Sequence, residues 1–391
     1  MSLPILPQDV IHNILLRLPV KSLMRLRCVS KSMDSLVHDP LFVKLHLHRA
    51  LGDLDRRRVL VCTDPPQYIL SENLGKGHDL TITMPIEYPF EVTPDDIEII
   101  GSCNGLLCFM VAVAYSLTDY KFILWNPSTG ACRELANPGP LIGHYPDIIP
   151  IYGFGYDAES NDYKIIRAAS PYNGATSTQL EIYSLKSNAW RKMQASLPCI
   201  LTDNYWRLFE PCFPGLYSRG TGVQTNGAVH WLEKRTADTH ETELILSFNL
   251  AKEHFEEVIP LLDNNKQDSF ISELQVLGGC LSVLVHKWKT SRIELWVMKE
   301  YGIKSSWTMT ATMPDNPGPL FEDSFNGDWL VPFGLCANGY LLFEMDGCEV
   351  LIYYPDRMIF SKIDLGENQN MFLVQEFVES LVSPHGSCYL K

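Results

Sequence analysis

The first fifty residues carry apolar side chains at α-helical spacing. Val10, Ile11, Ile14, Leu15 and Leu18 recur at i, i+1, i+4, i+5 and i+8, which places them on one stripe of a helix. The proline before this run suits a first helical turn, and the proline after it ends the run. The pattern therefore predicts an amphipathic helix near the start of the chain.

Three shorter helices are predicted to complete this head. They cover residues 22–29, 31–37 and 40–45, with Ser22 expected to cap the first of them and Asp39-Pro40 to open the last. A bundle of about fifty residues buries little apolar surface, so it is weakly stable alone. We therefore expect the head, residues 1–50, to rest on a partner or on the rest of the chain.

Residues 51–391 form a body that is predicted to consist of short, repeated strands. One repeated unit places Asn-Gly between apolar strands, at residues 101–109 (GSCNGLLCF), 223–231 (VQTNGAVHW) and 335–343 (LCANGYLLF). Asn-Gly favours a two-residue hairpin with a primed turn, because both residues tolerate a positive φ. A second hairpin follows each of these 17 to 23 positions later, as at Trp125-Asn126, so each repeat is expected to hold four strands.

The spacing of the repeats indicates a propeller. Successive first hairpins lie 52 to 65 positions apart, close to the roughly fifty-residue period of kelch-like blades. We therefore predict an all-β kelch-like propeller with six blades, in which residues 57–95 supply a degenerate blade. A strand within residues 371–382 is expected to pair into that first blade, because ring closure removes exposed sheet edges.

Strand direction predicts where recognition occurs. The short hairpin turns should share one end of the ring, and the long connections should emerge at the other; these are 136–150, 168–178, 194–218, 259–272 and 314–332. The stretch 200–217 has the aromatic and arginine content of interface anchors. The candidate substrate-binding residues are Tyr205, Trp206, Arg207 and Phe209, with Phe321 and Trp329 as neighbours. Alternatively, these aromatic residues cover the rim or seat the head.

The charge differs in sign between the two parts of the chain. The net charge of −14 divides into about +4 for residues 1–50 and −18 for residues 51–391. An acidic body repels phosphate backbones and anionic lipid, which argues against a nucleic-acid or membrane-surface partner. We therefore expect a protein partner.

Sequence signatures of catalysis and metal binding are missing. The eleven cysteines include no Cys-x-x-Cys pair, and the chain has no Gly-x-Ser-x-Gly elbow, His-Glu-x-x-His motif or phosphate loop. We therefore expect no catalytic residue, metal or cofactor, and a reducing cytoplasmic or nuclear location. Four tryptophans at matching points of the repeats are expected to pack between blades rather than to stack on sugars; they are Trp125, Trp190, Trp231 and Trp307.

The head resembles an F-box. The matching runs are residues 6–9 (LPQD), 14–23 (ILLRLPVKSL), 27–32 (RCVSKS) and 39–42 (DPLF). The resemblance implies docking on a Skp-type adaptor, which joins a cullin scaffold carrying a RING protein and a ubiquitin-conjugating enzyme. It also implies that the adaptor contact is lined by Leu6, Pro7, Ile14, Leu18, Leu23 and Val29. One departure is Met33, where F-boxes of this plant type usually carry tryptophan.

The body is similar to the F-box-associated interaction domain of plant F-box proteins. The similarity rests on residues 102–107 (SCNGLL), 125–129 (WNPST), 153–157 (GFGYD), 161–164 (NDYK) and 379–381 (ESL). Together the two resemblances imply a non-catalytic substrate receptor that recruits a target protein, as yet unidentified, for ubiquitination and degradation. The alternative is a propeller-fold enzyme or carbohydrate-binding protein with an ancillary helical head, since fold alone does not fix function.

Overall fold

The computed structural model describes most of the chain. The described residues are 7–62, 67–70, 83–89, 97–112, 120–139, 148–171, 177–197, 220–237, 240–259, 261, 268–315, 330–336, 338–345, 349–365 and 373–386.

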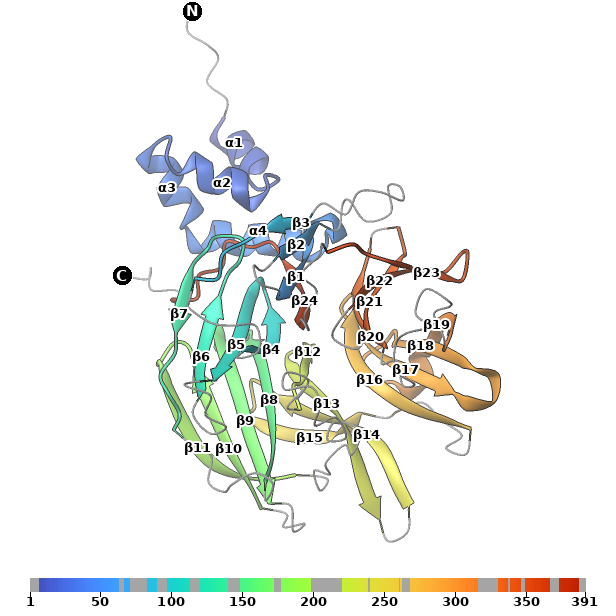
Figure 1. The fold of residues 1–391 in the computed structure, drawn as a ribbon. Helices are drawn as coiled ribbons and strands as arrows, with labels where there is room; N and C mark the ends of the chain where they lie inside the picture. The colour runs from blue at the N-terminus through green and yellow to red at the C-terminus, as the bar shows by residue number, and fades with distance from the viewer. Residues whose placement is uncertain are drawn as a thin grey trace, which may run out of the picture.

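The head is a small helical bundle that lies over one end of a β-ring (Figure 1). Its elements are α1 (Gln8–Leu15), α2 (Val20–Leu26), α3 (Lys31–Val37), α4 (Pro40–Leu51) and the 3-10 turn η1 (Leu54–Arg56). Two of the predicted starts are confirmed: Ser30 caps α3 by accepting from Met33 N at 3.2 Å, and Asp39 caps α4 by accepting from Phe42 N at 2.9 Å. The cap predicted at Ser22 is wrong, because α2 already begins after Pro19.

The head has its own apolar core, which one residue from the end of the chain completes. The core is formed by the buried side chains of Leu15, Leu16, Val20, Leu23, Val37, Phe42 and Leu381. Met33 packs against the same cluster, so its flexible thioether side chain fills space beside the core. Leu381 is separated from the other members by more than three hundred positions, so the head rests on the body as expected.

The body consists of antiparallel sheets. The described strands pair into six sheets of four strands each, in the orders β24-β1-β2-β3, β4-β5-β6-β7, β11-β10-β9-β8, β12-β13-β14-β15, β16-β17-β18-β19 and β20-β21-β22-β23. The strands are β1 (Arg57–Cys62), β2 (Gln67–Leu70), β3 (Thr83–Pro85), β4 (Ile97–Cys103), β5 (Leu106–Ala112), β6 (Tyr120–Trp125), β7 (Cys132–Glu134), β8 (Ile148–Asp157), β9 (Asp162–Pro171), β10 (Ser177–Ser184), β11 (Ala189–Ser196), β12 (Val223–Thr225), β13 (Ala228–Ala237), β14 (His240–Asn249), β15 (His254–Ile259), β16 (Ser269–Leu277), β17 (Cys280–Lys287), β18 (Arg292–Met298), β19 (Trp307–Pro314), β20 (Leu330–Leu335), β21 (Leu341–Met345), β22 (Glu349–Tyr354), β23 (Ile359–Lys362) and β24 (Leu373–Val378). Two 3-10 turns, η5 (Trp288–Thr290) and η6 (Lys304–Ser306), interrupt the connections before β18 and β19.

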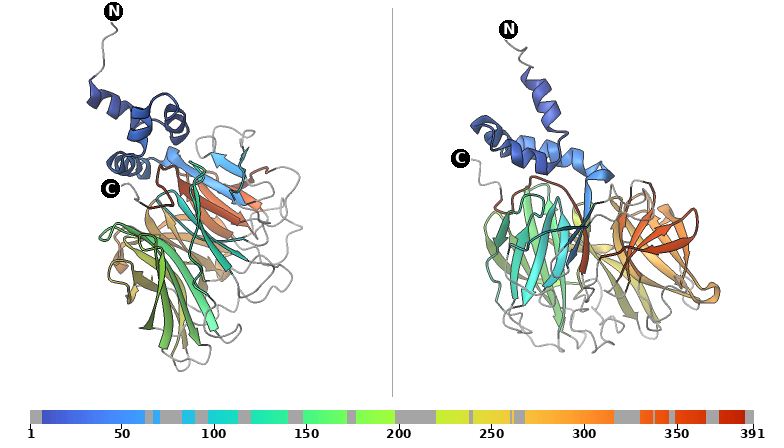
Figure 2. Two further views of the ribbon diagram at one scale, coloured as in Figure 1. Left: turned by 90° about the vertical axis from the view of Figure 1, so that its left-hand side faces the viewer. Right: turned by 45° about the horizontal axis from the view of Figure 1, so that its top comes forward.

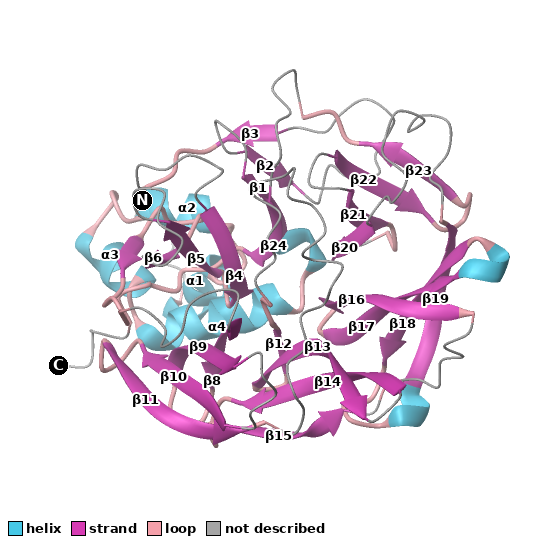
Figure 3. Ribbon diagram, turned by 60° about the horizontal axis from the view of Figure 1, so that its bottom comes forward, coloured by secondary structure: helices cyan, strands magenta, loops and turns pink. Residues whose placement is uncertain are grey.

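The sheets are arranged as the blades of a propeller (Figure 3). The inner strands β24, β4, β8, β12, β16 and β20 contact one another in this cyclic order. The expected closure is confirmed, because β24 pairs with β1 in an antiparallel register that runs from Arg57 opposite Val378 to Cys62 opposite Leu373. Among the described residues, the last strand, β24, is therefore the innermost strand of the first blade, which ties the C-terminal region to the start of the body.

Hairpin turns with positive φ connect several inner strands to their neighbours. Asn104 and Gly105 have φ values of 54° and 84°, and Asn226 and Gly227 have values of 51° and 73°. These values fit the primed turns that the sequence predicts. The third predicted hairpin has a longer connection, in which Cys336 N donates to Tyr340 O at 2.9 Å.

The four repeat tryptophans lie between neighbouring blades, as expected. Trp125 belongs to a cluster with strands β1 and β24, Trp190 packs on Phe122 of the preceding blade, and Trp231 and Trp307 lie in the two following interfaces. Trp125, Trp231 and Trp307 are buried. They therefore stabilise blade packing and do not form an exposed stacking surface for sugars.

The ring has two distinct faces (Figure 2). We call the end where β1 begins and β24 stops the head face, because η1 and the helices lie there. The short turns 104–105, 226–227 and 278–279 lie on this face. The antiparallel order then places the ends of the long connections on the opposite side, the far face; these connections include the one between β11 and β12 and the one between β19 and β20.

Candidate functional site

The head exposes a group of large apolar side chains. They are Val10, Ile14, Val29, Leu41 and Leu45, with exposed fractions of 38, 47, 72, 63 and 42 per cent. Val10 and Ile14 lie one turn apart on α1, and Leu41 and Leu45 lie one turn apart on α4. So much exposed apolar area on a bundle this small is typical of a protein-binding surface.

The predicted adaptor residues fall into two groups. Pro7, Ile14 and Val29 are exposed, and Leu18 is half-buried beside the core. Leu23 is fully buried and packs inside the head, so its predicted surface role is corrected to a structural one. Leu6 lies outside the described residues.

Sequence reasoning missed three of the exposed residues. The sequence pattern places Val10 on a helical stripe without predicting its exposure, and it does not mark Leu41 and Leu45 as surface residues. A signal for them exists in the i, i+4 spacing of α4, because Phe42 and His46 share a second face that is buried. The face of α4 that carries Phe42 and His46 therefore packs inside the head, while the face that carries Leu41 and Leu45 is exposed to solvent.

Charged contacts hold the head elements together. Arg27 Nε donates to Asp34 Oδ1 at 2.8 Å, and this bond lowers the pKa of the Asp34 carboxyl. Arg56 Nη1 donates to Leu18 O at 3.1 Å, and a second bond runs from Arg56 Nη2 to the main-chain oxygen of Arg17. The side chain of Arg56 therefore anchors η1 to the end of α1, directly before the ring begins.

A buried histidine lies beside the same anchor. His46 Nε2 is 3.0 Å from Leu18 O, and burial lowers the pKa of His46 below its usual value. The imidazole of His46 is therefore neutral at physiological pH. We assign it a structural role at the junction of head and body.

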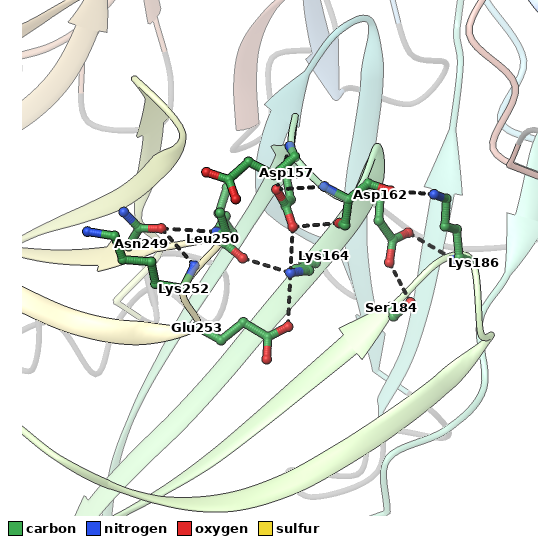
Figure 4. Close-up of polar contacts among 12 residues, drawn as sticks. Asp157, Asp162, Lys164, Ser184, Lys186, Asn249, Leu250, Lys252 and Glu253 are labelled. Atoms are coloured by element: carbon green, nitrogen blue, oxygen red, sulfur yellow. Dashed lines mark hydrogen bonds and ion pairs between the residues drawn. The ribbon is translucent and has the colours of Figure 1, made fainter.

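A polar network on the head face joins two blades (Figure 4). Lys164 Nζ lies 2.8 Å from Asp157 Oδ2, 2.9 Å from Glu253 Oε1 and 2.7 Å from Leu250 O. Burial raises the pKa of Asp157, but hydrogen bonds from Lys164 and Ser160 outweigh this effect and hold it below its usual value. Lys164 and both carboxylates have partners, so the network stabilises the contact between the two blades.

The described residues show neither a metal-binding cluster nor a membrane-spanning helix. Across the part of the chain that the structure describes, no group of three or more His, Cys, Asp or Glu side chains is placed to hold a metal ion. None of the described helices has the length and apolar character needed to cross a bilayer.

The predicted substrate-binding residues lie in two connections of the ring. Tyr205, Trp206, Arg207, Phe209, Phe321 and Trp329 all fall outside the described residues. The strands that flank them are β11 and β12 for the first four, and β19 and β20 for the other two. These strands reach the far face at the ends where the two connections begin and finish.

Two family models match the chain, and together they cover most of it. Residues 3–45 match the F-box domain, and residues 58–384 match the F-box associated beta propeller domain. The second match spans well over half of the chain.

Curated relatives of the chain include proteins of Arabidopsis thaliana. F-box protein CPR1 is 30% identical over 79% of this chain and 73% of its own length. An F-box/kelch-repeat protein is 28% identical over 79% of both chains, and F-box/WD-40 repeat-containing protein 1 is 26% identical over 80% of this chain and 70% of its own. The similarity thus extends through the ring and is not confined to the head.

Proposed function

The chain belongs to the F-box proteins that carry an F-box-associated β-propeller, and from this premise we propose that it is the substrate-recognition subunit of a Skp-cullin-F-box ubiquitin ligase. The observation that carries the proposal is the pairing of an exposed apolar surface on the head with a ring whose far face points away from it. One side is suited to hold an adaptor while the other holds a target protein.

The adaptor-binding surface is proposed to comprise the exposed residues of α1 and α4 and those around α2. It includes Pro7, Ile14 and Val29 from the sequence prediction, together with Val10 and Leu41 from the structure. Burying these side chains against a Skp-type adaptor would remove apolar area from water, which is the main favourable term in protein association.

The substrate-binding surface is proposed to lie on the far face. The connection between β11 and β12 supplies Tyr205, Trp206, Arg207 and Phe209, and the connection between β19 and β20 supplies Phe321 and Trp329. Aromatic and arginine side chains on loops of a rigid frame are common binding anchors. The target is a protein, since the −18 charge of residues 51–391 repels polyanions.

We further propose that the chain contributes no catalytic group. The ubiquitin-transfer chemistry would be supplied by the conjugating enzyme that the cullin carries. This chain would only hold the target protein near that enzyme. The buried repeat tryptophans support this view over a carbohydrate-binding propeller, because their rings are not available for stacking on a sugar.

Affinity purification tests the substrate surface. The intact chain and a Trp206→Ala/Phe209→Ala variant are compared in cells with the proteasome and ligase blocked, and co-purifying proteins are identified. The expected result is loss of the target with normal adaptor recovery. A Lys289→Ala/Thr290→Ala variant, altered in another far-face turn, is the matched control. Equal recovery of the target by all three proteins would reject the proposed surface.

A further inference from the structure

The segment that follows β24 runs across the head face between ring and head. We call residues 379–382 the strap. Asn126, which follows β6, donates from Nδ2 to Ser380 O at 3.0 Å and to Val382 O at 2.8 Å. The side chain of Asn126 is fully buried under this segment. The blade that contains β4–β7 is therefore hydrogen-bonded to the strap.

The role of Asn126 stands out when it is compared with Asn249. Both residues begin the turn between the third and fourth strands of a blade. In both, the side-chain Oδ1 accepts a hydrogen bond from the main-chain N–H two positions later: Asn126 from Ser128 at 2.9 Å, and Asn249 from Ala251 at 3.0 Å. The Nδ2 of Asn249 stays within its own hairpin and bonds Glu256 at 2.9 Å. The Nδ2 of Asn126 instead bonds the strap, so an asparagine at the equivalent turn position makes a long-range contact in this blade.

The other side of the strap enters the head. Leu381 is 7% exposed and belongs to the apolar cluster of the helices, where it joins Leu23 and Phe42. Removing its side chain would leave a cavity in this small core. Leu381 therefore joins the strap to the head, while Asn126 joins the neighbouring strap residues to the ring.

The strap is also joined to the linker between head and ring. Glu379 N donates to Arg56 O at 2.9 Å, and Arg58 Nη2 lies 3.2 Å from Glu379 Oε1. Arg56 in turn bonds the main chain of α1 through Leu18 O. The head is thus held at two points, by its covalent linker and by the strap, and two attachments restrict rotation far more than one.

We propose that the strap is a positioning device that fixes the head relative to the ring, with Asn126 and Leu381 as its positioning residues. The inference rests on the proposed function. A receptor that holds a target on its far face must present it at a set distance from the ubiquitin donor bound through the head. Freedom at the junction would dilute the target over many positions and lower its effective concentration at the donor.

The test uses the full chain bound to its adaptor, cullin and RING protein. A short peptide epitope is inserted after Lys289 in the far-face turn, and a lysine-bearing nanobody against that epitope serves as the substrate. Ubiquitin transfer to the nanobody is timed for Leu381→Ala and Asn126→Ala. The matched controls are Leu274→Ala, a ring leucine with the same 7% exposure, and Asn249→Ala, the equivalent turn residue.

A second readout follows the junction directly. Energy transfer between fluorophores on non-canonical residues at Ser35 in the head and at the exposed Met309 in the ring reports the spread of head-to-ring distances. We expect a wider spread and transfer slowed about fivefold or more in both strap variants, with adaptor affinity and nanobody binding unchanged. Both controls should match the unaltered chain.

The outcomes separate the inference from its premise. If Leu381→Ala loses the adaptor, Asn126→Ala decides, because it leaves every head residue in place. An unchanged distance spread or an unchanged transfer rate in Asn126→Ala overturns the strap proposal while the ligase role stands. Failure of the unaltered chain to transfer any ubiquitin overturns the ligase role, and the strap proposal with it.

Discussion

The side-chain nitrogen of Asn126 lies 2.8 Å from the main-chain oxygen of Val382, although 256 positions separate the two residues in the chain. A turn in the second sheet thereby holds the segment that leaves the last strand. Because that segment also carries Leu381 into the helical head, head, first blades and chain end form one connected unit. We expect this unit to unfold cooperatively.

Gly105 is predicted to tolerate substitution worse than Gly227. Both occupy the second position of an Asn-Gly turn with positive φ, so alanine strains each backbone by about 1–2 kcal/mol. A Cβ on Gly105 would also lie 2.6 Å from Val378 O and would clash with Ser380, whereas a Cβ on Gly227 would meet nothing within 4 Å. We therefore expect Gly105→Ala to cost about 1–3 kcal/mol more in unfolding free energy. Equal midpoints in denaturant for the two variants would show that the strap does not pass over this turn.

Lys164 is predicted to matter more than an exposed lysine in a similar ion pair. Its side chain is 6% exposed and faces two carboxylates, so Lys164→Met leaves Asp157 buried without its cation and should cost about 3–5 kcal/mol. Lys121→Met, which breaks the exposed pair with Glu134, should cost less than about 1 kcal/mol. Denaturant unfolding measures both. Adding Asp157→Asn to Lys164→Met should recover part of the loss, and a further loss instead would contradict this account.

His230 is predicted to make the ring less stable in acid. It is fully buried between Val223 O and the Tyr301 hydroxyl, and burial lowers its pKa to about 4 from a usual 6.5. The unfolded chain therefore takes up a proton first as the pH falls. The contribution of His230 to the unfolding free energy is fully present above pH 6.5 and is lost as the pH falls from 6.5 to 4. The total loss is about 3 kcal/mol at most.

The difference between the unaltered chain and His230→Gln isolates this contribution, because the carboxyl groups titrate in both. The unfolding free energy is measured from pH 7 to pH 4 in each, with His254→Gln at an exposed site as the control. The unaltered chain should lose more stability over this window than His230→Gln does. Parallel curves for the two proteins would rule out a buried neutral histidine.

Local patterns explain which features the sequence could predict. The Asn-Gly turn at 104–105, the cap at Asp39 and the stripe that contains Leu15 all depend on neighbours within a few positions, and the structure confirms each. The closing strand was also predictable, because an open ring would leave an unpaired edge beside β1.

Long-range packing explains what the sequence could not predict. Leu23 and Ile14 look alike in an apolar helical pattern, but Leu23 is buried in a cluster that includes Phe42 and Leu381, whereas Ile14 is exposed. The motif at 379–381 was visible in the sequence, but its contact with Asn126 depends on how the ring closes. Such contacts join residues hundreds of positions apart, and periodicity carries no information about them.

Titration of the purified chain with a Skp-type adaptor, followed by calorimetry, tests the central claim most directly. We expect one adaptor per chain, binding weakened about tenfold or more by Ile14→Asp, which places a charge on the exposed face of α1, and normal unfolding of that variant. Leu23→Ala, by contrast, should lower the free energy of unfolding by about 2–5 kcal/mol, because Leu23 packs in the head core. No binding by the unaltered chain, or undiminished binding by a folded Ile14→Asp variant, would contradict the assignment of the head as the adaptor-binding surface.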